Sequence, residues 1–481
     1  MERRCARLLR ERLTAELAVH DADEGLRAVG NLHTAPHAVR EIFTVTPTDT
    51  DEDWAAIAER LRAVPGAYEG YRAALELGLE RKLFAAPRPT ATFIEQLTQW
   101  AGAEGGPGWY EEFAADGPQA LRTDLDTAAK AATGAVVALR DWMRDVYAPA
   151  IEGAPEVVGR ERYARLSRHF NGTDLDLDEA YAYGWAEYHR LLGEMRTEAE
   201  KILPGAATPW VALAHIDEHG AHIDGVDEVR QWLQDLMDEA IEALDGTHFE
   251  LAERVRKVES RIAPPGGAAA PYYTRPGRTW LPTMGETRFP VYDLVSTWYH
   301  EGVPGHHLQL AQWAHVAEDL SRYQATVGIV SANAEGWALY AERLMDELGF
   351  LTDPERRLGY LDAQMMRALR VIVDIGMHLE LEIPADSPFH PGERWTPDLA
   401  QEFYGAHCSR PADFVESEMT RYLTIPGQAI GYKLGERAWL LGRENARRRH
   451  GDAFDAKAWH MAALSQGSLG LDDLVDELSA L

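Results

Sequence analysis

The sequence predicts an all-α protein with only a few short β strands. Apolar residues recur every three or four positions through long segments, and the alternation typical of half-buried strands is scarce. The chain has 481 residues, 46% of them hydrophobic, which is ample for a globular interior. A chain of this length is too long for one simple hydrophobic core, so we expect two large lobes.

Three amphipathic helices are expected in the first half of the chain. The first occupies residues 120–147, which are rich in helix-forming residues. The second occupies residues 177–203, with Asp178 as a candidate for its N-terminal cap. The third occupies residues 227–244 and is expected to stop at Gly246.

A break in composition follows at residues 262–290, which are rich in proline, glycine and aromatic residues. This segment predicts irregular chain with one or two short strands, around residues 279–281 and 288–289. We therefore expect an N-terminal helical lobe over residues 1–261 and a second helical lobe over 262–481, with a cleft between them. The second lobe includes two further expected helices, at 333–349 and 356–383.

Charge and targeting signals narrow the class of protein. The formal net charge is −30, from 48 basic and 78 acidic residues, and such a surface repels nucleic acid and acidic membranes. No apolar run approaches the roughly 20 residues of a membrane span, and the first residues lack the apolar core of a signal peptide. Only Cys5 and Cys408 are present, far apart in the chain, which argues against a disulfide framework. We expect a cytoplasmic protein without nucleic-acid or membrane partners.

Residues 299–309 read YHEGVPGHHLQ and contain the His-Glu pair typical of zinc hydrolases. The usual second histidine follows four residues after the first, but Pro304 stands there. On an ideal helix His306 lies about 120° around from His300, and His307 lies on the right face but about 10 Å further along. Proline and glycine in the insert disfavour a regular helix, so we expect a bulge or break that brings His306 back beside His300.

The chemistry of a catalytic zinc site suits these residue types. Zinc takes three protein ligands and keeps one position open for water, and a nearby carboxylate accepts a proton from that water. Glu301, beside His300, is the candidate general base. The candidate third ligand is Glu335, which follows His306 by 29 residues, enough for a helix to turn and return. Small neighbours of Glu335 would let its helix approach the His-Glu helix closely.

The segments HEGVPGHHLQ (300–309), EGWALYAE (335–342) and RYLTIPGQAIGYKLG (421–435) resemble the bacterial family known as domain of unknown function 885. The resemblance implies a zinc metallopeptidase with an HE-x-x-PGH motif. It also implies a two-lobed helical architecture similar to the thimet oligopeptidase and angiotensin-converting enzyme group. On this resemblance His300, His306 and Glu335 bind one Zn²⁺ per chain, and Glu301 is the base. The family pattern favours His306 over His307, which we expect to be structural.

Further site residues are expected from the C-terminal half. In similar helical peptidases a late tyrosine stabilises the oxyanion, and Tyr432 is the candidate here. Arg421 could bind a substrate carboxylate through two hydrogen bonds, and Tyr422 and Gln428 could line the cleft. His378, on a predicted helix, could also reach the cleft.

Structural roles compete with these functional ones. Tyr432 could be an ordinary core tyrosine, Arg421 could pair with Glu418 one turn earlier, and His378 could be a satisfied buried histidine. A second histidine cluster, HIDEHGAH at 215–222, places three histidines at helical spacing. Its glycine and polar surroundings favour a solvated helix end over a metal site.

These residues predict a zinc-dependent hydrolase that cleaves a peptide or peptide-like amide bond. The expected substrate is a short peptide or small amide, and the expected assembly is a monomer or homodimer. One alternative is an amide hydrolase acting on an aminoacylated small-molecule intermediate in a biosynthetic pathway. A second alternative is a metal-binding or ligand-binding protein without catalysis, against which the His-Glu pair argues, because a structural zinc site needs no base.

Overall fold

The structure, a computed structural model, describes residues 2–103, 105–263 and 270–481. Helix accounts for 68% of it and strand for 4%, so the predicted all-α class is confirmed. Residues 264–269, part of the segment expected to be irregular, lie outside the described residues.

The chain divides into two compact units. The larger unit comprises Met1–Glu16, Gly159–Val415 and Gly427–Leu481, and the smaller unit comprises Leu17–Val158 and Glu416–Pro426. This division differs from the boundary expected at 261/262. Residues 159–261 belong with the later residues because α9 (Leu177–Ile202) packs along α16 (Pro354–His378). A break in composition marks a loop, whereas packing between helices decides which segments form one unit.

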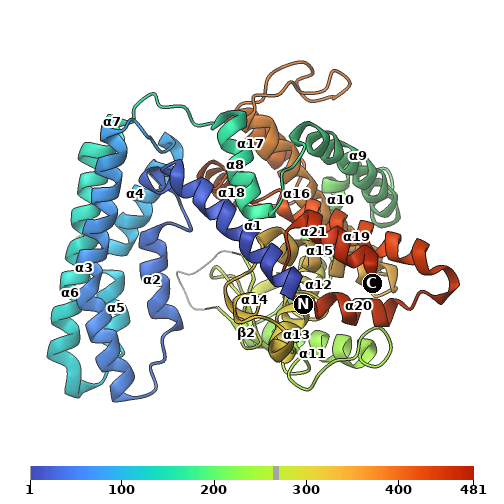
Figure 1. Cartoon of the computed structure of the whole chain (residues 1–481), viewed down its shortest axis with the longest axis horizontal. Helices are drawn as coiled ribbons and strands as arrows, with labels where there is room; N and C mark the ends of the chain where they lie inside the picture. The colour runs from blue at the N-terminus through green and yellow to red at the C-terminus, as the bar shows by residue number, and fades with distance from the viewer. Residues whose placement is uncertain (1, 104, 264–269) are drawn as a thin grey trace. The chain divides into compact units, whose positions relative to one another are not determined.

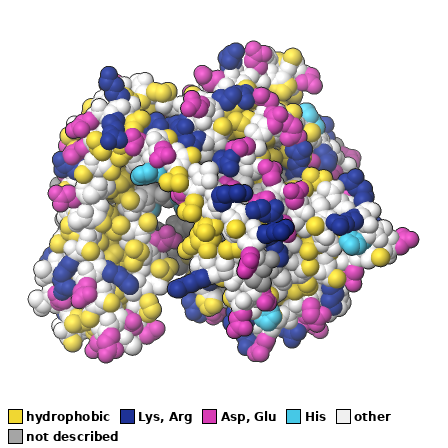
Figure 2. Space-filling view, in the orientation of Figure 1, with side chains coloured by type: hydrophobic (Ala, Val, Ile, Leu, Met, Phe, Trp, Pro, Cys, Tyr) yellow, Lys and Arg dark blue, Asp and Glu magenta, His cyan; other side chains and the backbone are white. Residues whose placement is uncertain are grey.

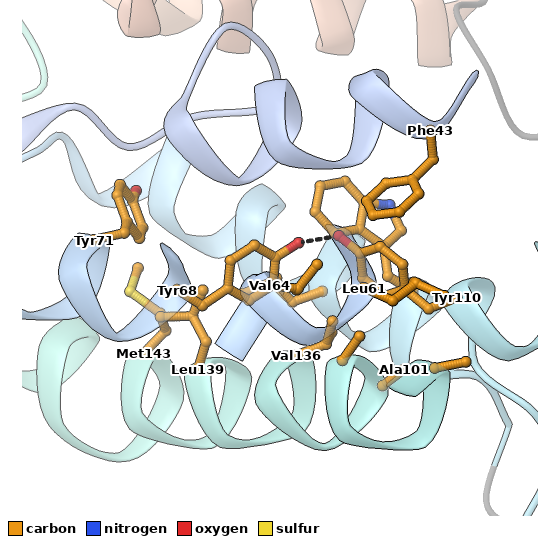
Figure 3. Packing of buried hydrophobic residues seen from close by; sticks show 14 of the residues in the cluster. Phe43, Leu61, Val64, Tyr68, Tyr71, Ala101, Tyr110, Val136, Leu139 and Met143 are labelled. Atoms are coloured by element: carbon orange, nitrogen blue, oxygen red, sulfur yellow. Dashed lines mark hydrogen bonds between the residues drawn. The ribbon is translucent and has the colours of Figure 1, made fainter. Parts of the chain in front are cut away.

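The smaller unit is a bundle built around the long helix α3 (Asp51–Glu80), which lies side by side with α6 (Arg122–Trp142) (Figure 1). Thr50 begins α3 with a capping box, because its side chain accepts a hydrogen bond from the Asp53 N–H and the Asp53 carboxylate accepts one from the Thr50 N–H. In the core the hydroxyls of Tyr68 and Tyr110 lie 2.8 Å apart (Figure 3). The other helical segments of this unit are η1 Glu24–Arg27, α2 Ala35–Val45, α4 Pro87–Ala101, α5 Trp109–Ala115, η2 Gln119–Leu121, the π-helical turn η3 Met143–Tyr147 and α7 Ala148–Ala150.

The larger unit holds most of the remaining helices. They are α8 Gly159–Asn171, α10 Pro209–His219, α11 Val226–Leu244, α12 Val291–Glu301, α13 His306–His315, η4 Ala317–Asp319, α14 Arg322–Thr326, α15 Ser331–Glu347, α17 Pro397–Ala406, α19 Gly431–His450, η5 Gly451–Ala453, α20 Ala456–Leu464 and α21 Leu471–Ala480. The helices α1 (Glu2–Asp21) and α18 (Ala412–Thr424) each contribute residues to both units.

Within the described part of the larger unit, five short strands form two small sheets. Strand β1 (His222–Asp224) pairs antiparallel with β5 (Arg288–Pro290). In the second sheet β4 (Arg278–Leu281) lies between β2 (Glu259–Ile262), which is parallel to it, and β3 (Tyr272–Thr274), which is antiparallel. The two strands expected around 279–281 and 288–289 are confirmed, and their pairing partners were not predicted. Strands β1, β2 and β3 were not predicted, because so few residues carry too little alternation, whereas β4 and β5 were expected from the change in composition around them.

Two helix ends differ from the predictions. The N-terminal cap of α9 is Asp176 rather than Asp178, because the Asp176 carboxylate accepts hydrogen bonds from two backbone N–H groups, those of Asp178 and Glu179. Helix α16 ends at His378 rather than near residue 383, since Glu380 has a positive φ of 51° that a helix does not allow.

A close crossing between α15 and α19 brings two glycines together. A Cβ atom on Gly336 would lie 2.3 Å from the carbonyl carbon of Gly435, so only glycine fits at this position. The small residues near Glu335 were expected to admit the His-Glu helix. Gly336 instead admits α19, which carries Tyr432.

The surface in Figure 2 carries acidic and basic side chains interspersed among apolar ones. Exposed ion pairs such as Arg72–Glu76 and Lys257–Glu253 join residues one helical turn apart. Solvated pairs of this kind each contribute little to stability.

Candidate metal centre

The predicted interruption between His300 and His306 is present. Helix α12 ends at Glu301, residues 302–305 form a turn, and α13 begins at His306. The Gly305 N–H donates to the carbonyl oxygen of Tyr299, at 3.0 Å. A Cβ atom on Gly305 would lie 1.9 Å from the His300 carbonyl oxygen, so the turn closes this tightly only with glycine at this position.

Trp337 of α15 holds the turn from the other side. Its indole Nε1–H donates to the carbonyl oxygens of Pro304, at 2.9 Å, and Gly305, at 3.1 Å. Trp337 is fully buried. The same helix therefore fixes the turn and, two residues earlier, carries Glu335.

Three side chains from α12, α13 and α15 converge. Glu335 Oε2 lies 3.5 Å from His300 Nε2 and 3.3 Å from His306 Nε2. One ligand atom from each residue lies within 4.8 Å of the others. Two ligands bound to one tetrahedral zinc at their usual bond lengths are about 3.4 Å apart, so these separations fit a single metal ion. Glu335 Oε2 is buried and accepts no hydrogen bond, which also suits a metal ligand.

The electrostatics of the cluster favour a positive charge at its centre. Burial raises the pKa of the Glu335 carboxyl, but the two histidines outweigh burial and hold it well below its usual range. Burial lowers the pKa of His300, but the neighbouring carboxylates of Glu335 and Glu342 raise it to about 9. The carboxylate and the two imidazoles therefore attract either a proton or a metal cation.

Glu342 supports the cluster from behind and was not predicted. Its Oε1 lies 2.7 Å from His300 Nδ1, and its other oxygen accepts a hydrogen bond from the hydroxyl of Ser296. Glu342 is wholly buried, and the guanidinium of Arg367 lies 3.9 Å away. A carboxylate in this position directs the other ring nitrogen of a histidine toward a metal. The sequence could have indicated Glu342 through its position seven residues after Glu335, because residues at this spacing lie on nearly the same face of a helix.

Glu301 is a buried carboxylate at the end of α12. It is 8% exposed, and its side chain makes no hydrogen bond or ion pair within the described ranges. Burial raises its pKa above the usual value, against the opposing effect of the two histidines. A carboxylate of this kind accepts a proton more readily than one in water.

Tyr432 lies beside the cluster at the start of α19. Its ring centroid is 6.3 Å from that of His300, and the two ring planes are within 18° of parallel. The guanidinium carbon of Arg370 lies 4.6 Å from the Tyr432 ring centroid. The structure therefore brings the predicted tyrosine next to a predicted metal ligand.

The protein-family comparison matches residues 1–478 to the family described as "Bacterial protein of unknown function (DUF885)". The chain belongs to the DUF885 family.

Solved structures similar to this DUF885 protein show its fold. A "putative lipoprotein from Colwellia psychrerythraea" aligns with a TM-score of 0.82 at 20% identity, over 94% of this chain and 80% of that chain. A "putative lipoprotein of unknown function from Shewanella oneidensis" aligns with a TM-score of 0.71 at 17% identity, over 98% of this chain and 86% of that one. A carboxypeptidase of Pyrococcus furiosus reaches a TM-score of only 0.29 at 13% identity, too low to support an argument. No curated protein is similar in sequence.

These neighbours contradict the expected cytoplasmic location. Both well-aligned structures are described as lipoproteins, a class attached to membranes through lipid, so the prediction made from the N-terminal residues is wrong. No helix in the described part of the chain has the length and apolar character needed to cross a membrane.

His307 turns away from the cluster. Its Nε2–H donates to the Val255 carbonyl oxygen at 2.8 Å, and its Nδ1 lies 3.4 Å from the hydroxyl of Tyr273. Burial lowers its pKa, so the neutral ring is favoured. Both nitrogens are engaged away from the metal ligands, in agreement with the expected structural role.

Two other predicted residues of the larger unit are well buried. His378 has no exposed surface, and its ring centroid lies 5.5 Å from that of Tyr163. Gln428 donates from Nε2 to the hydroxyl of Ser331 at 3.2 Å. The surroundings of His378 fit the buried-histidine alternative, and a role for Gln428 in substrate binding stays a prediction.

Arg421 and Tyr422 belong to the smaller unit and share one partner. Arg421 pairs with Glu418 at 3.0 Å, and the Tyr422 hydroxyl donates to the same carboxylate at 2.6 Å. The pair expected as the alternative for Arg421 is therefore present. Substrate contact by either residue stays a prediction.

The second histidine cluster does not gather around a metal position. His215 and His219 stack with ring centroids 4.6 Å apart, while both ring nitrogens of His222 engage backbone carbonyl oxygens. Among the residues that the structure describes, only His300, His306 and Glu335 form a group able to hold a metal ion.

Proposed function

We propose that this DUF885 protein is a zinc-dependent hydrolase that cleaves a peptide or peptide-like amide bond. The convergence of His300 Nε2, His306 Nε2 and Glu335 Oε2 at 3.3–3.5 Å carries the proposal. Its second support is Glu301, a buried carboxylate with raised pKa beside the cluster. A structural metal site would need no such neighbour.

His300, His306 and Glu335 would hold one Zn²⁺ per chain. The bound ion supplies a Lewis acid and makes a water molecule more acidic. Glu342 keeps the proton of His300 on Nδ1 and so leaves Nε2 free as a ligand.

Glu301 then acts as the general base and general acid. Its carboxylate takes a proton from the attacking water and delivers that proton to the nitrogen of the departing amine. The Tyr432 hydroxyl donates a hydrogen bond to the oxyanion that forms on the carbonyl oxygen. The position of Tyr432 against His300 supports this role.

The proposal includes the finer architecture and the substrate class. A His-Glu helix followed by a returning helix with the third ligand agrees with a thimet oligopeptidase-like arrangement. Short peptides or small amides are the proposed substrates, and Arg421, Tyr422, Gln428 and His378 stay candidates for contacting them. The protein would act as a monomer or homodimer.

Glu301→Gln tests the proposal. The variant removes the proton acceptor but none of the three ligand atoms, so zinc content should stay at one per chain while turnover falls by about 10²–10⁴. The measurement combines metal analysis with amine release from free dipeptides and tripeptides, blocked dipeptide amides and aminoacylated small molecules.

Glu318→Gln, an exposed change in η4, is the control and should keep full activity. Full activity in Glu301→Gln would refute the base assignment. If the native zinc protein cleaves none of these amides, the non-catalytic alternative replaces the proposal. Cleavage of the aminoacylated compounds alone would favour the biosynthetic alternative.

A further inference from the structure

Helix α16 is buried on all sides from Leu358 to His378, yet it carries a polar stripe. The stripe repeats every three or four residues along an otherwise apolar sequence, which places its members on one face of the helix. Its members are Gln364, Arg367, Arg370, Asp374 and His378. Buried polar groups persist where they have specific partners, so the contacts of this stripe indicate its role.

Three members of the stripe hold the segment from Gly427 to Lys433. Asp374 Oδ2 accepts a hydrogen bond from the Gly427 N–H at 2.9 Å. Gln364 Oε1 accepts one from Lys433 Nζ at 2.7 Å. Arg370, between them on α16, contacts Tyr432. One helix face thus fixes both ends of the segment and the tyrosine within it.

Arg370 contacts the aromatic ring of Tyr432. The guanidinium carbon lies 4.6 Å from the ring centroid, within cation–π range, and Arg370 is only 4% exposed. The Tyr432 ring also stacks near His300. A cation against an aromatic face is attracted to the ring quadrupole, so it restricts the ring's position.

Lys433 anchors the backbone of α19 independently of Arg370. Its ammonium group is fully buried and pairs with Glu436 at 2.5 Å and with Glu187 of α9 at 3.1 Å. With Gln364 this makes three partners from three helices. Loss of Arg370 should therefore leave the first turn of α19 in place and affect the tyrosine ring.

We infer that Arg370 is a positioning residue that holds the ring of Tyr432 beside the metal ligands, with the polar stripe of α16 as its support. Arg370 acts through Tyr432. The inference rests on the proposed function only for the consequence in catalysis, because the position of the ring is a property of the folded chain.

The test is fluorine NMR on the full-length zinc protein with 3-fluorotyrosine placed at position 432. Arg370→Met removes the cation, Arg370→Gln keeps a polar side chain without charge, and Arg370→Lys keeps the charge. Arg437→Met is the matched control, since Arg437 is on the same helix as Tyr432 and lies 4.5 Å from a different ring, that of Tyr183.

The expected result is a shifted or broadened resonance in Arg370→Met and Arg370→Gln, a native-like one in Arg370→Lys, and no change in Arg437→Met. An unchanged resonance in the folded Met or Gln variant overturns the inference. Equal changes in Arg370→Met and Arg437→Met also overturn it, because they indicate general loosening. If Arg370→Met does not fold, the comparison of the resonance in Arg370→Gln with that in Arg370→Lys decides.

A kinetic arm uses the blocked dipeptide amide that the native enzyme cleaves best. Tyr432→Phe should lower kcat by about 10² in the native background, but by less than about tenfold in the Arg370→Met background, while KM and zinc content change little. Additive losses overturn the inference. If no amide is cleaved, the proposed function fails, and the resonance still decides the positioning of the ring.

Discussion

At the residue scale, the proposed metal ligand His300 depends on the side chain of Glu342, which is not itself a proposed ligand. Glu342 lies behind His300, accepts hydrogen bonds from His300 and Ser296, and has no exposed surface. Its removal leaves all three predicted ligands in the chain. The change in zinc affinity in a Glu342 variant therefore measures how much zinc binding depends on the orientation of the His300 ring.

Glu342→Gln should weaken zinc binding by about 10–100-fold, because an amide is a poorer acceptor for the His300 Nδ1–H than a carboxylate is. Competition with a chelator of known affinity measures the loss. Glu347→Gln, on the same helix but near its exposed end, is the control and should bind zinc as the native protein does. Native affinity in Glu342→Gln would exclude the supporting role.

His460 gives a prediction about pH that is independent of the metal. Its ring is 3% exposed, its Nε2 lies 2.6 Å from the Tyr340 hydroxyl, and burial, with a smaller effect from Arg443, lowers its pKa to about 3. The folded protein thus favours the neutral ring, whereas the unfolded chain binds a proton near pH 6.5. The stability that this residue contributes is full above pH 6.5 and declines as pH falls toward 3.

Between pH 7.5 and 5.5 the free energy of unfolding should therefore fall by about 1.4 kcal/mol more in the native protein than in His460→Gln. Urea titrations at both pH values measure the difference. His315→Gln, at an exposed position of α13, should behave as the native protein. Identical pH dependence in native protein and His460→Gln would contradict the neutral buried state.

At the scale of elements, the turn between α12 and α13 decides whether the two histidines meet. Gly305 packs against the His300 carbonyl oxygen, and Trp337 donates to the turn from α15. In the H-E-x-x-H motif the two histidines lie one turn apart on a continuous helix. Here the turn between two helices takes the place of that helical segment. Its geometry is therefore part of the candidate metal centre.

Gly305→Ala should disrupt this turn, because the added Cβ would lie 1.9 Å from a backbone oxygen that cannot move without displacing His300. We expect zinc affinity to fall together with a loss of stability of about 2 kcal/mol or more. Calorimetry of zinc binding and thermal denaturation measure the two effects.

Gly193→Ala is the matched glycine control. Nothing lies within 4 Å of a Cβ at this position in α9, so the change should leave zinc binding intact and slightly favour the helix. Normal zinc binding in Gly305→Ala would show that the turn tolerates a wider geometry.

At the scale of the whole molecule, metal binding should be visible as stability. The three proposed ligands come from helices α12, α13 and α15, which the unfolded chain does not hold together. An ion that binds the folded state alone stabilises it by about 2.7 kcal/mol at one hundred times its dissociation constant.

Chelation should therefore lower the thermal midpoint, and added zinc should raise it with the logarithm of its free concentration. His300→Ala lacks one ligand and should show a much smaller dependence. A midpoint that does not respond to zinc in the native protein, at concentrations that saturate the site by metal analysis, would contradict this coupling. Magnesium at equal concentration controls for ionic strength, because it binds nitrogen ligands poorly.

Local patterns in the sequence were sufficient for the all-α class, for most long helices and for the group of His300, His306 and Glu335. The helices follow from periodicity and the pairing of His300 with His306 from spacing within a short motif, where neighbours in sequence are also neighbours in space, whereas Glu335 was indicated by the similarity to zinc peptidases. The turn at residues 302–305 belongs here too, because proline and glycine restrict the backbone wherever they occur. The expected cytoplasmic location was wrong, because the well-aligned solved structures are described as lipoproteins.

Packing between distant segments decided the rest. The support of His300 by Glu342, the stripe of α16 against residues 427–433 and the crossing at Gly336 and Gly435 each join helices far apart in the chain. The division into two units follows from the same packing, because α9 and α16 share one interior. A periodic pattern shows which face of a helix is buried, but only the folded chain shows which helix covers it.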